Sequence, residues 1–384
     1  MRIVDVQAYW LQAEIDRPFA WSLRWATRRS AVLVKVVTDE GIVGWGEAGS
    51  SGTAAIVTTI NADYRPLLLN RDPFDVEPIW EDLYALTRDA GQKGVAVDAI
   101  SGVDIALWDV LGKAVGKPVH KLLGGAARSR VTAYATGLYY VDTENPLADR
   151  VAEAVGYVEQ GFRAMKMKVG GLSLEEDLAH VRAVRDAIGP NVLLMVDANH
   201  AYNAYTAIAI GRRLEELNVL WIEEPVLPED VDGYLDVKAA LNMAVAGGEC
   251  EYTRFGFRPL LTRRAVDIVQ PDLGRAGGLS EGKKIAAMAN AFQIQCIPHV
   301  WGTGVVQAAA LHFLATLPAC PPVRNPQPLW HHPLLEFDRT PNPFRGRVAP
   351  DPTLEPDGTV RVPSGPGLGI EVDEAAVRHF ARQE

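Results

Sequence analysis

Three acidic residues follow three apolar runs at equal spacing. Asp197 ends VLLMVD, Glu223 ends VLWIE and Glu249 ends AVAGGE, each 26 residues after the one before. Because about 26 residues make one strand, one loop and one helix, the spacing predicts equivalent positions on successive parallel strands. Carboxylates brought together away from water repel one another unless a multivalent cation lies between them. The all-oxygen donor set favours Mg²⁺ over Zn²⁺, which usually recruits His or Cys.

Two lysines lie two residues apart in the apolar stretch AMKMKV. Side chains at this spacing on a strand point the same way, so Lys166 and Lys168 point together into the barrel mouth or out among the helices. A parallel strand covered on both faces leaves little water for them among the helices. Inside the mouth we expect each ammonium to lower the pKa of the other, which frees one lysine to act as a base.

A possible acid/base pair ends two later apolar runs. Asp272 ends VDIVQPD and His299 ends IQCIPH, 27 residues further on. A carboxylate on the neighbouring strand end would orient the imidazole and raise its pKa. Because this pair and the two lysines come from distant strands of the series, we expect them to flank the cation from opposite sides.

Two further residues have both a functional and an ordinary interpretation. Asn199, two residues after Asp197, could hold substrate or a metal-bound water, or could be a simple turn residue. Glu336, in LLEFD, could be an acid on an eighth strand that hydrogen-bonds the substrate, or a solvated side chain. The weaker candidates are Cys250, interpreted as packing, His200, which adjoins the site, and His331 and His332.

A divalent cation beside two proton-transfer groups suits one kind of reaction, the abstraction of a proton α to a carboxylate. That proton is weakly acidic, so the charge developing on the doubly charged enediolate must be stabilised as it forms. Reprotonation would then give racemisation, whereas loss of a β-substituent would give elimination. The residues alone leave both outcomes open.

Composition excludes several classes of partner. The 384 residues are 48% apolar and 22% charged with a net charge of −10, which argues against nucleic acid or an anionic membrane as partner. A small anionic substrate remains compatible, since a bound cation can dominate the local field. Three cysteines without paired spacing indicate a reducing cytoplasm, and no run of 18 apolar residues occurs. We therefore expect a cytoplasmic protein.

The elements that must position these residues fall into three segments. Residues 1–125 read as an α+β domain, with strands IVDVQAYWL, SAVLVKVVTD and GIVGWGEA before helices that start near Thr53, Pro73 and Val95. Residues 126–345 alternate between apolar strands and helical periods, as in a (β/α) barrel with seven visible units. The eighth strand is uncertain because residues 318–345 are rich in proline. Residues 346–384 are expected to return to the first domain.

The lysine pair, the three carboxylates, Asp272 with His299, and the stretch SGVDIALWDVLGK together resemble the enolase superfamily, mandelate racemase subgroup, over essentially the whole chain. The resemblance implies a modified TIM barrel of seven βα units plus a final strand, an N-terminal capping domain that the C-terminus joins, and Mg²⁺ as cofactor. It further implies that Lys168 is the base, that Lys166 tunes it and contacts the substrate carboxylate, and that the protein forms homo-oligomers.

The resemblance also implies a lid. The loop from Arg17 to Arg29 should close over the barrel mouth, where Trp21, Arg24 and Trp25 could shape a pocket for an anionic substrate. An exposed aromatic hairpin tip is the equally good alternative.

Three stretches, VDANHAY, HVWGTGV and LLEFDRTPNPFR, are most similar to the lactone cycloisomerases of this subgroup. These enzymes open an aldaro-lactone, such as a galactaro- or glucaro-lactone, to a 2-keto-3-deoxy diacid. An acid-sugar dehydratase is the alternative, with His299 protonating a departing hydroxyl. A racemase or epimerase of a 2-hydroxy acid and a non-catalytic enolase-like protein are further alternatives.

Overall fold

The computed structural model describes residues 1–49, 51–325 and 331–382. Its N-terminal sheet has three antiparallel strands in the order β1 (Ile3–Ala20), β2 (Trp25–Thr38) and β3 (Val43–Ala48), which confirms the three predicted strands. A tight turn after Thr38 joins β2 to β3, where Thr38 N donates to Ile42 O at 3.0 Å and Gly41 has φ +78°.

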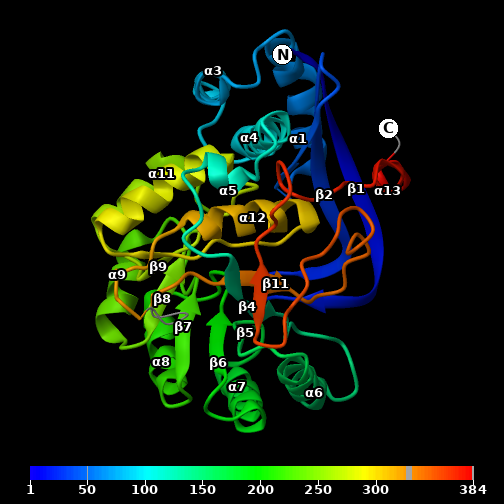
Figure 1. The fold of residues 1–384 in the computed structure, drawn as a ribbon. Coiled ribbons are helices and arrows are strands. Elements are labelled where there is room, and N and C mark those ends of the chain that lie inside the picture. Colours follow the sequence, from blue (N-terminus) through cyan, green and yellow to red (C-terminus); the bar gives the residue numbers. More distant parts are fainter. Residues whose placement is uncertain (50, 326–330, 383–384) are drawn as a thin grey trace.

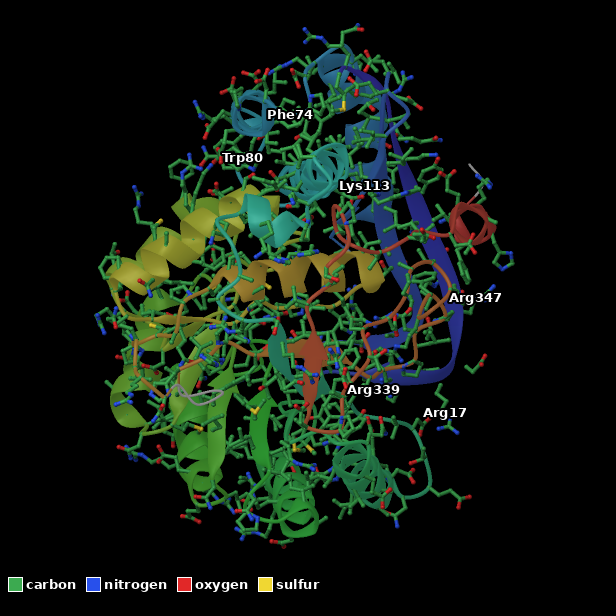
Figure 2. The ribbon with its side chains drawn as sticks, in the orientation of Figure 1. Arg17, Phe74, Trp80, Lys113, Arg339 and Arg347 are labelled. Carbon is green, nitrogen blue, oxygen red and sulfur yellow. The ribbon has the colours of Figure 1, made fainter. Side chains whose placement is uncertain are left out.

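The expected loop from Arg17 to Arg29 is wrong in extent. β1 runs on to Ala20 and β2 starts at Trp25, with Phe19 opposite Ala26 in the pairing. The extension is held because the ring of Phe19 is buried edge-on against Tyr139, with centroids 4.8 Å apart. The segment is therefore a long hairpin that passes along one side of the barrel, with Arg17 near its end (Figures 1 and 2).

The helices of the N-terminal part are α1 (Thr53–Thr58), η1 (Thr59–Tyr64), α2 (Arg65–Leu68), α3 (Val76–Thr87), α4 (Val95–Ala114) and α5 (Val119–Leu122). The helix predicted to start near Val95 is α4, and its apolar side chains are largely buried. This helix lies so close to β3 that a Cβ on Gly46 would stand 2.0 Å from the carbonyl oxygen of Gly102. Glycine at position 46 therefore permits the sheet and helix to pack directly.

Eight parallel strands curl into the barrel, within the described residues. They are β4 (Arg130–Thr136), β5 (Ala164–Lys168), β6 (Leu193–Asp197), β7 (Val219–Glu223), β8 (Ala244–Gly247), β9 (Ile268–Val269), β10 (Gln295–Cys296) and β11 (Leu335–Asp338). Their order is β10-β9-β8-β7-β6-β5-β4-β11. The helices between them are α6 (Pro146–Glu159), α7 (Leu174–Ile188), α8 (Ala204–Glu215), α9 (Val231–Ala240), α10 (Thr253–Thr262), α11 (Gly278–Ala291) and α12 (Gly304–Thr316).

Seven strands are each followed by a helix and β11 closes the series, which confirms the modified TIM barrel. The eighth strand, uncertain from the proline-rich sequence, is short but regular, and Leu335 pairs with Ala133 of β4. Among the described helices, none combines the length and apolar character that a membrane span requires.

The C-terminal segment lies against the first sheet. A short strand, β12 (Thr359–Arg361), pairs antiparallel with β4, and α13 (Glu374–Phe380) follows. Arg382 N donates to Trp10 O at 2.9 Å, and Lys35 Nζ lies 2.7 Å from Glu374 Oε1. Figure 1 shows α13 beside β1, on the opposite side of the hairpin from the helices of the cap.

The N-terminal part of the chain, which forms the cap, also contacts two loops at the barrel mouth. Trp80 Nε1 donates to Gly277 O at 2.8 Å, where the loop after β9 leads into α11 (Figure 2). Glu47 of β3 accepts from Thr303 N at 2.9 Å and Val306 N at 3.0 Å, at the start of α12. These contacts matter because the same two loops carry the candidate acid/base pair.

Candidate active site

The three predicted carboxylates converge at the barrel mouth. In the sheet, Lys168 pairs with Asp197, and Asp197 pairs with Glu223, so these residues are level on β5, β6 and β7. The carboxylate oxygens of Asp197, Glu223 and Glu249 can all lie within 4.8 Å of one another. The predicted cluster is therefore assembled by the fold.

The equal spacing nevertheless misplaces one member. Glu223 is level with Ala246 on β8, so Glu249 lies three residues beyond the equivalent strand position. β8 ends at Gly247, and Gly248 then adopts φ +121°, a conformation suited to glycine. Glu249 joins the cluster from a loop, and not from the strand as predicted.

The electrostatics of the cluster fit a hard cation. Burial raises the pKa of Glu223 to about 8, against the opposing effect of Lys166. Burial, reinforced by Glu224, raises the pKa of Glu249 to about 7. By contrast, the burial of Asp197 is outweighed by Lys168 and Lys166, and its pKa falls to about 2. The two lysines do not fully offset the repulsion among these oxygen donors. A divalent cation bound between the carboxylates would therefore stabilise them.

Both lysines point into the mouth, where they are paired with acids. Lys166 Nζ lies 2.5 Å from Glu223 Oε1 and 2.9 Å from Glu336 Oε1. Lys168 Nζ donates to Asp197 Oδ2. The expected lowering of their pKa is wrong for this arrangement. Burial does lower the pKa of Lys168, but Asp197 and Tyr139 raise it more than Lys166 lowers it, so its pKa lies above the ordinary value. The pKa of Lys166 is likewise raised, since Glu223 and Glu336 outweigh its burial.

The predicted acid/base pair is formed. His299 Nδ1 lies 2.7 Å from Asp272 Oδ2, and its Nε2 lies 3.6 Å from Glu249 Oε2. The second oxygen of Asp272 accepts from Gly274 N at 2.7 Å, which fixes the carboxylate. Burial lowers the pKa of His299, but Glu249, Glu336 and Asp272 outweigh it and raise this pKa to about 10. The imidazole is therefore a cation at neutral pH in this arrangement.

Glu336 and Asn199 both lie at the cluster. Glu336, on β11, is 1% exposed and accepts from Thr136 Oγ1 at 2.7 Å and Val300 N at 2.9 Å, so it is not a solvated side chain. Asn199 donates its backbone N–H to Asp197 Oδ1 at 2.9 Å and adopts φ +42°. Its side-chain oxygen is buried and accepts no hydrogen bond, which leaves it free to receive a ligand.

Arg24 and Trp25 lie at the tip of the hairpin. Together with Trp21 they line a cavity of about 510 Å³ between the hairpin and the loops that follow β4 and β5. The guanidinium of Arg24 lies over the ring of Trp21 at 5.2 Å, and Trp25 is about half exposed. Ser22 Oγ donates to Ala198 O at 2.8 Å, so the tip rests on the segment that carries Asn199. No hydrogen bond or ion pair within the described ranges joins Arg24 or Trp25 to the carboxylates.

Two residues of the site were not predicted. Gln270 Nε2 and Trp221 Nε1 donate to Glu223 Oε2 at 2.8 Å and 3.1 Å and so fix the orientation of that carboxylate. A signal for both was present in the sequence. Trp221 precedes Glu223 by two residues and Gln270 precedes Asp272 by two, the spacing that places side chains on one face of a strand.

Comparisons with known proteins identify the family. Residues 5–124 match the mandelate racemase / muconate lactonizing enzyme N-terminal domain, and residues 149–376 match the enolase C-terminal domain-like family. The chain is 43% identical to D-galactarolactone cycloisomerase of Agrobacterium fabrum, with 99% of each chain covered. It is 36% identical to arabinonate dehydratase of Saccharolobus solfataricus, over 91% of this chain and 90% of the relative.

A solved structure shares the whole fold. The crystal structure of a racemase from Streptomyces coelicolor A3(2) with bound magnesium is 30% identical, with a TM-score of 0.88 and coverage of 99% of this chain and 100% of that one. Fold, site and sequence thus agree. The chain belongs to the enolase superfamily, mandelate racemase subgroup, and is an enzyme of the mandelate racemase type.

Proposed function

We propose that this enzyme removes the proton α to a carboxylate of an aldaro-lactone and expels the lactone oxygen from the β-carbon, which gives a 2-keto-3-deoxy diacid. The observation that carries the proposal is the convergence of Lys168 and His299 on one buried carboxylate cluster, from strands far apart in the barrel order. Two proton-transfer groups then face a substrate held at the cluster. The 43% identity to a lactone cycloisomerase supports a lactone as substrate.

Asp197, Glu223 and Glu249 would hold the Mg²⁺ ion, because their oxygen donors suit it; Asp197 and Glu223 are buried and Glu249 is partly buried. A bound magnesium in the related racemase structure supports this assignment. When bound, the ion would supply positive charge that stabilises the negative charge developing on the substrate carboxylate and would compete with Lys168 for Asp197.

The lysines would divide two tasks. Lys166 is held by Glu223 and Glu336 and stays protonated, so it would bind and orient the substrate carboxylate. With a cation on Asp197, Lys168 at the end of β5 would lose the contact that raises its pKa, and in its neutral form it would accept the α-proton at Nζ. Tyr139, whose ring lies 4.9 Å from that nitrogen, would keep water away from it.

His299 would act on the opposite side of the bound substrate from Lys168. Asp272 binds Nδ1, so Nε2 is the nitrogen that faces the cluster. In the elimination, the α C–H electron pair forms the new C=C bond and the β C–O bond breaks, which releases the lactone carboxylate. A carboxylate leaves without prior protonation, so His299 would afterwards donate the proton that converts the enol product to the 2-keto form.

An acid-sugar dehydratase is the second candidate. A departing hydroxyl needs a proton, and the protonated His299 could supply it from the same position. The 36% identity to arabinonate dehydratase supports this second candidate.

The experiment that tests the proposal incubates purified protein and Mg²⁺ with galactaro- and glucaro-lactones and, separately, with the open-chain acids. Formation of 2-keto acid is followed by semicarbazone absorbance. We expect product from at least one lactone and none when Lys168→Ala replaces the wild type. Turnover of open-chain acids alone would overturn the lactone proposal in favour of dehydration.

A further inference from the structure

A second group of ligand side chains lies beside the carboxylate cluster. His200, Glu224 and Cys250 follow the ends of β6, β7 and β8, and their ligand atoms can all lie within 4.8 Å of one another. Glu224 and Cys250 directly follow Glu223 and Glu249 in the sequence. None of the three takes part in the proposed reaction.

The backbone holds two of these residues in an unfavourable conformation. His200 has φ +53° and Glu224 has φ +41°, a region that residues other than glycine rarely adopt. His200 N donates to Glu224 O at 2.7 Å, and this bond ties the two strand ends together. The side chains meet as well, with His200 Nδ1 3.3 Å from Glu224 Oε2. Strain of this kind is retained where the surrounding structure fixes a functional geometry.

The group also contains a buried carboxylate with one unfilled oxygen. Glu224 is 1% exposed, its side chain contacts the Cys250 thiol and the His200 ring, and its Oε1 has no hydrogen-bond partner. An unpaired buried carboxylate oxygen is unfavourable unless a cation or a donor reaches it. Arg275 lies near Cys250, but its guanidinium is engaged by Tyr252 Oη at 2.8 Å and by Asp98 Oδ1 at 3.7 Å.

We propose that His200, Glu224 and Cys250 form a second divalent-cation site that takes a thiophilic ion such as Zn²⁺ or Co²⁺. One nitrogen, one oxygen and one sulfur donor suit these ions, whereas Mg²⁺ prefers oxygen alone. Three protein ligands leave a fourth tetrahedral position for water. Coordination by Cys250 releases the thiol proton to solvent.

The two sites are therefore built from the same three strand ends with different chemistry. Asp197, Glu223 and Glu249 offer oxygen only, while the three neighbouring residues offer a mixed set. Each ion should select its own site, so the second site can be studied with the first one filled by Mg²⁺.

The test is a Co²⁺ titration of the full chain in excess Mg²⁺, followed by the thiolate-to-cobalt charge-transfer band. We expect one equivalent of Co²⁺ to generate the band and Zn²⁺ to displace it. Cys250→Ser should abolish the band, and His200→Gln should weaken Co²⁺ binding at least about tenfold. The matched control is Cys296→Ser, which removes a partly buried thiol on β10 and should leave the band intact.

Three results would overturn the proposal. They are the absence of a band in the wild type, a band that persists in Cys250→Ser, and a band lost in Cys296→Ser. Circular dichroism of each variant shows whether the fold is kept, and His200→Gln provides a second variant at a partly exposed position. Because the readout is spectroscopic, it is independent of whether the protein opens lactones.

Discussion

The imidazole of His299 is bound through Nδ1 to Asp272 Oδ2 at 2.7 Å, which leaves Nε2 directed at Glu249. The two residues come from loops that the N-terminal cap holds in place, through Trp80 on one side and Glu47 on the other. The cap therefore positions an acid/base pair that belongs to the barrel.

Asp272→Asn should keep the fold but reduce kcat by about 10²–10⁴-fold, because a carboxamide cannot stabilise the imidazolium as a carboxylate does. The loss of the carboxylate should also shift the pH dependence of kcat that arises from His299 to lower pH. Steady-state kinetics across pH 6–10 measure both effects. The control is Asp267→Asn, which removes a partly exposed carboxylate paired with Lys238 and should leave kcat unchanged.

Gln270→Ala should weaken Mg²⁺ binding by about 10–100-fold, because Gln270 orients Glu223 through a 2.8 Å hydrogen bond. Isothermal titration calorimetry with Mg²⁺ gives the affinity. Gln293→Ala, which loses only a contact to Asn290 O at the exposed end of α11, serves as the control. Equal Mg²⁺ affinity in wild type and Gln270→Ala would show that this side chain does not position a metal ligand.

The stability of the metal-free protein should fall as pH rises from about 5 to 9. The pKa of Glu223 is raised by burial to about 8 and that of Glu249 to about 7, from an ordinary 4.5, and the pKa of His299 is raised to about 10 from 6.5. In this window the folded chain keeps protons that the unfolded chain loses, so the free energy of unfolding decreases with pH.

Thermal unfolding in EDTA at pH 5.5 and 8.5 measures this trend. Saturating Mg²⁺ should reduce it, because the ligand carboxylates are then ionised at both pH values. A midpoint in EDTA that rises between pH 5.5 and 8.5 would be inconsistent with the raised pKa values.

Glu47→Ala should destabilise the protein by about 1–3 kcal/mol, because it leaves buried N–H donors of Thr303 and Val306 without an acceptor. Glu47→Gln retains an acceptor and should lose less. Urea unfolding provides the free energies. Glu40→Ala is the control: it removes an exposed carboxylate paired with the N-terminal ammonium and should change the free energy of unfolding by less than about 1 kcal/mol. An equal loss in both alanine variants would refute the specific role of Glu47.

The barrel could be predicted from sequence because apolar strands and helical periods repeat over most of residues 126–345. The same repeat placed Asp197 and Glu223 correctly. It misplaced Glu249, because a constant spacing cannot reveal that β8 is one residue shorter than β7 and ends in a glycine turn. The spacing between the acidic residues gives the length of one strand–loop–helix repeat, but it does not show where the strand in that repeat ends.

The ionisation of the lysines could not be predicted either. In the sequence, the nearest charge to Lys166 is Lys168, which predicts that each lowers the pKa of the other. In the fold, each lysine contacts a carboxylate from another strand. Those contacts join residues 29 or more positions apart and reverse the direction of the pKa shift. The hairpin tip was similarly ambiguous, because its extension depends on Tyr139, a residue distant in sequence.

The roles of Lys168 and His299 are tested most directly by exchange of the substrate α-proton in D₂O, followed by NMR, with wild type, Lys168→Ala and His299→Ala in the presence of Mg²⁺. For the wild type we expect deuterium at the carbon α to the carboxylate, or in the derived 2-keto product. We expect loss of the proton-abstraction step in Lys168→Ala and loss of turnover in His299→Ala, with both variants folded. Unchanged exchange and turnover in both variants would contradict the assignment of these two residues as the proton-transfer groups.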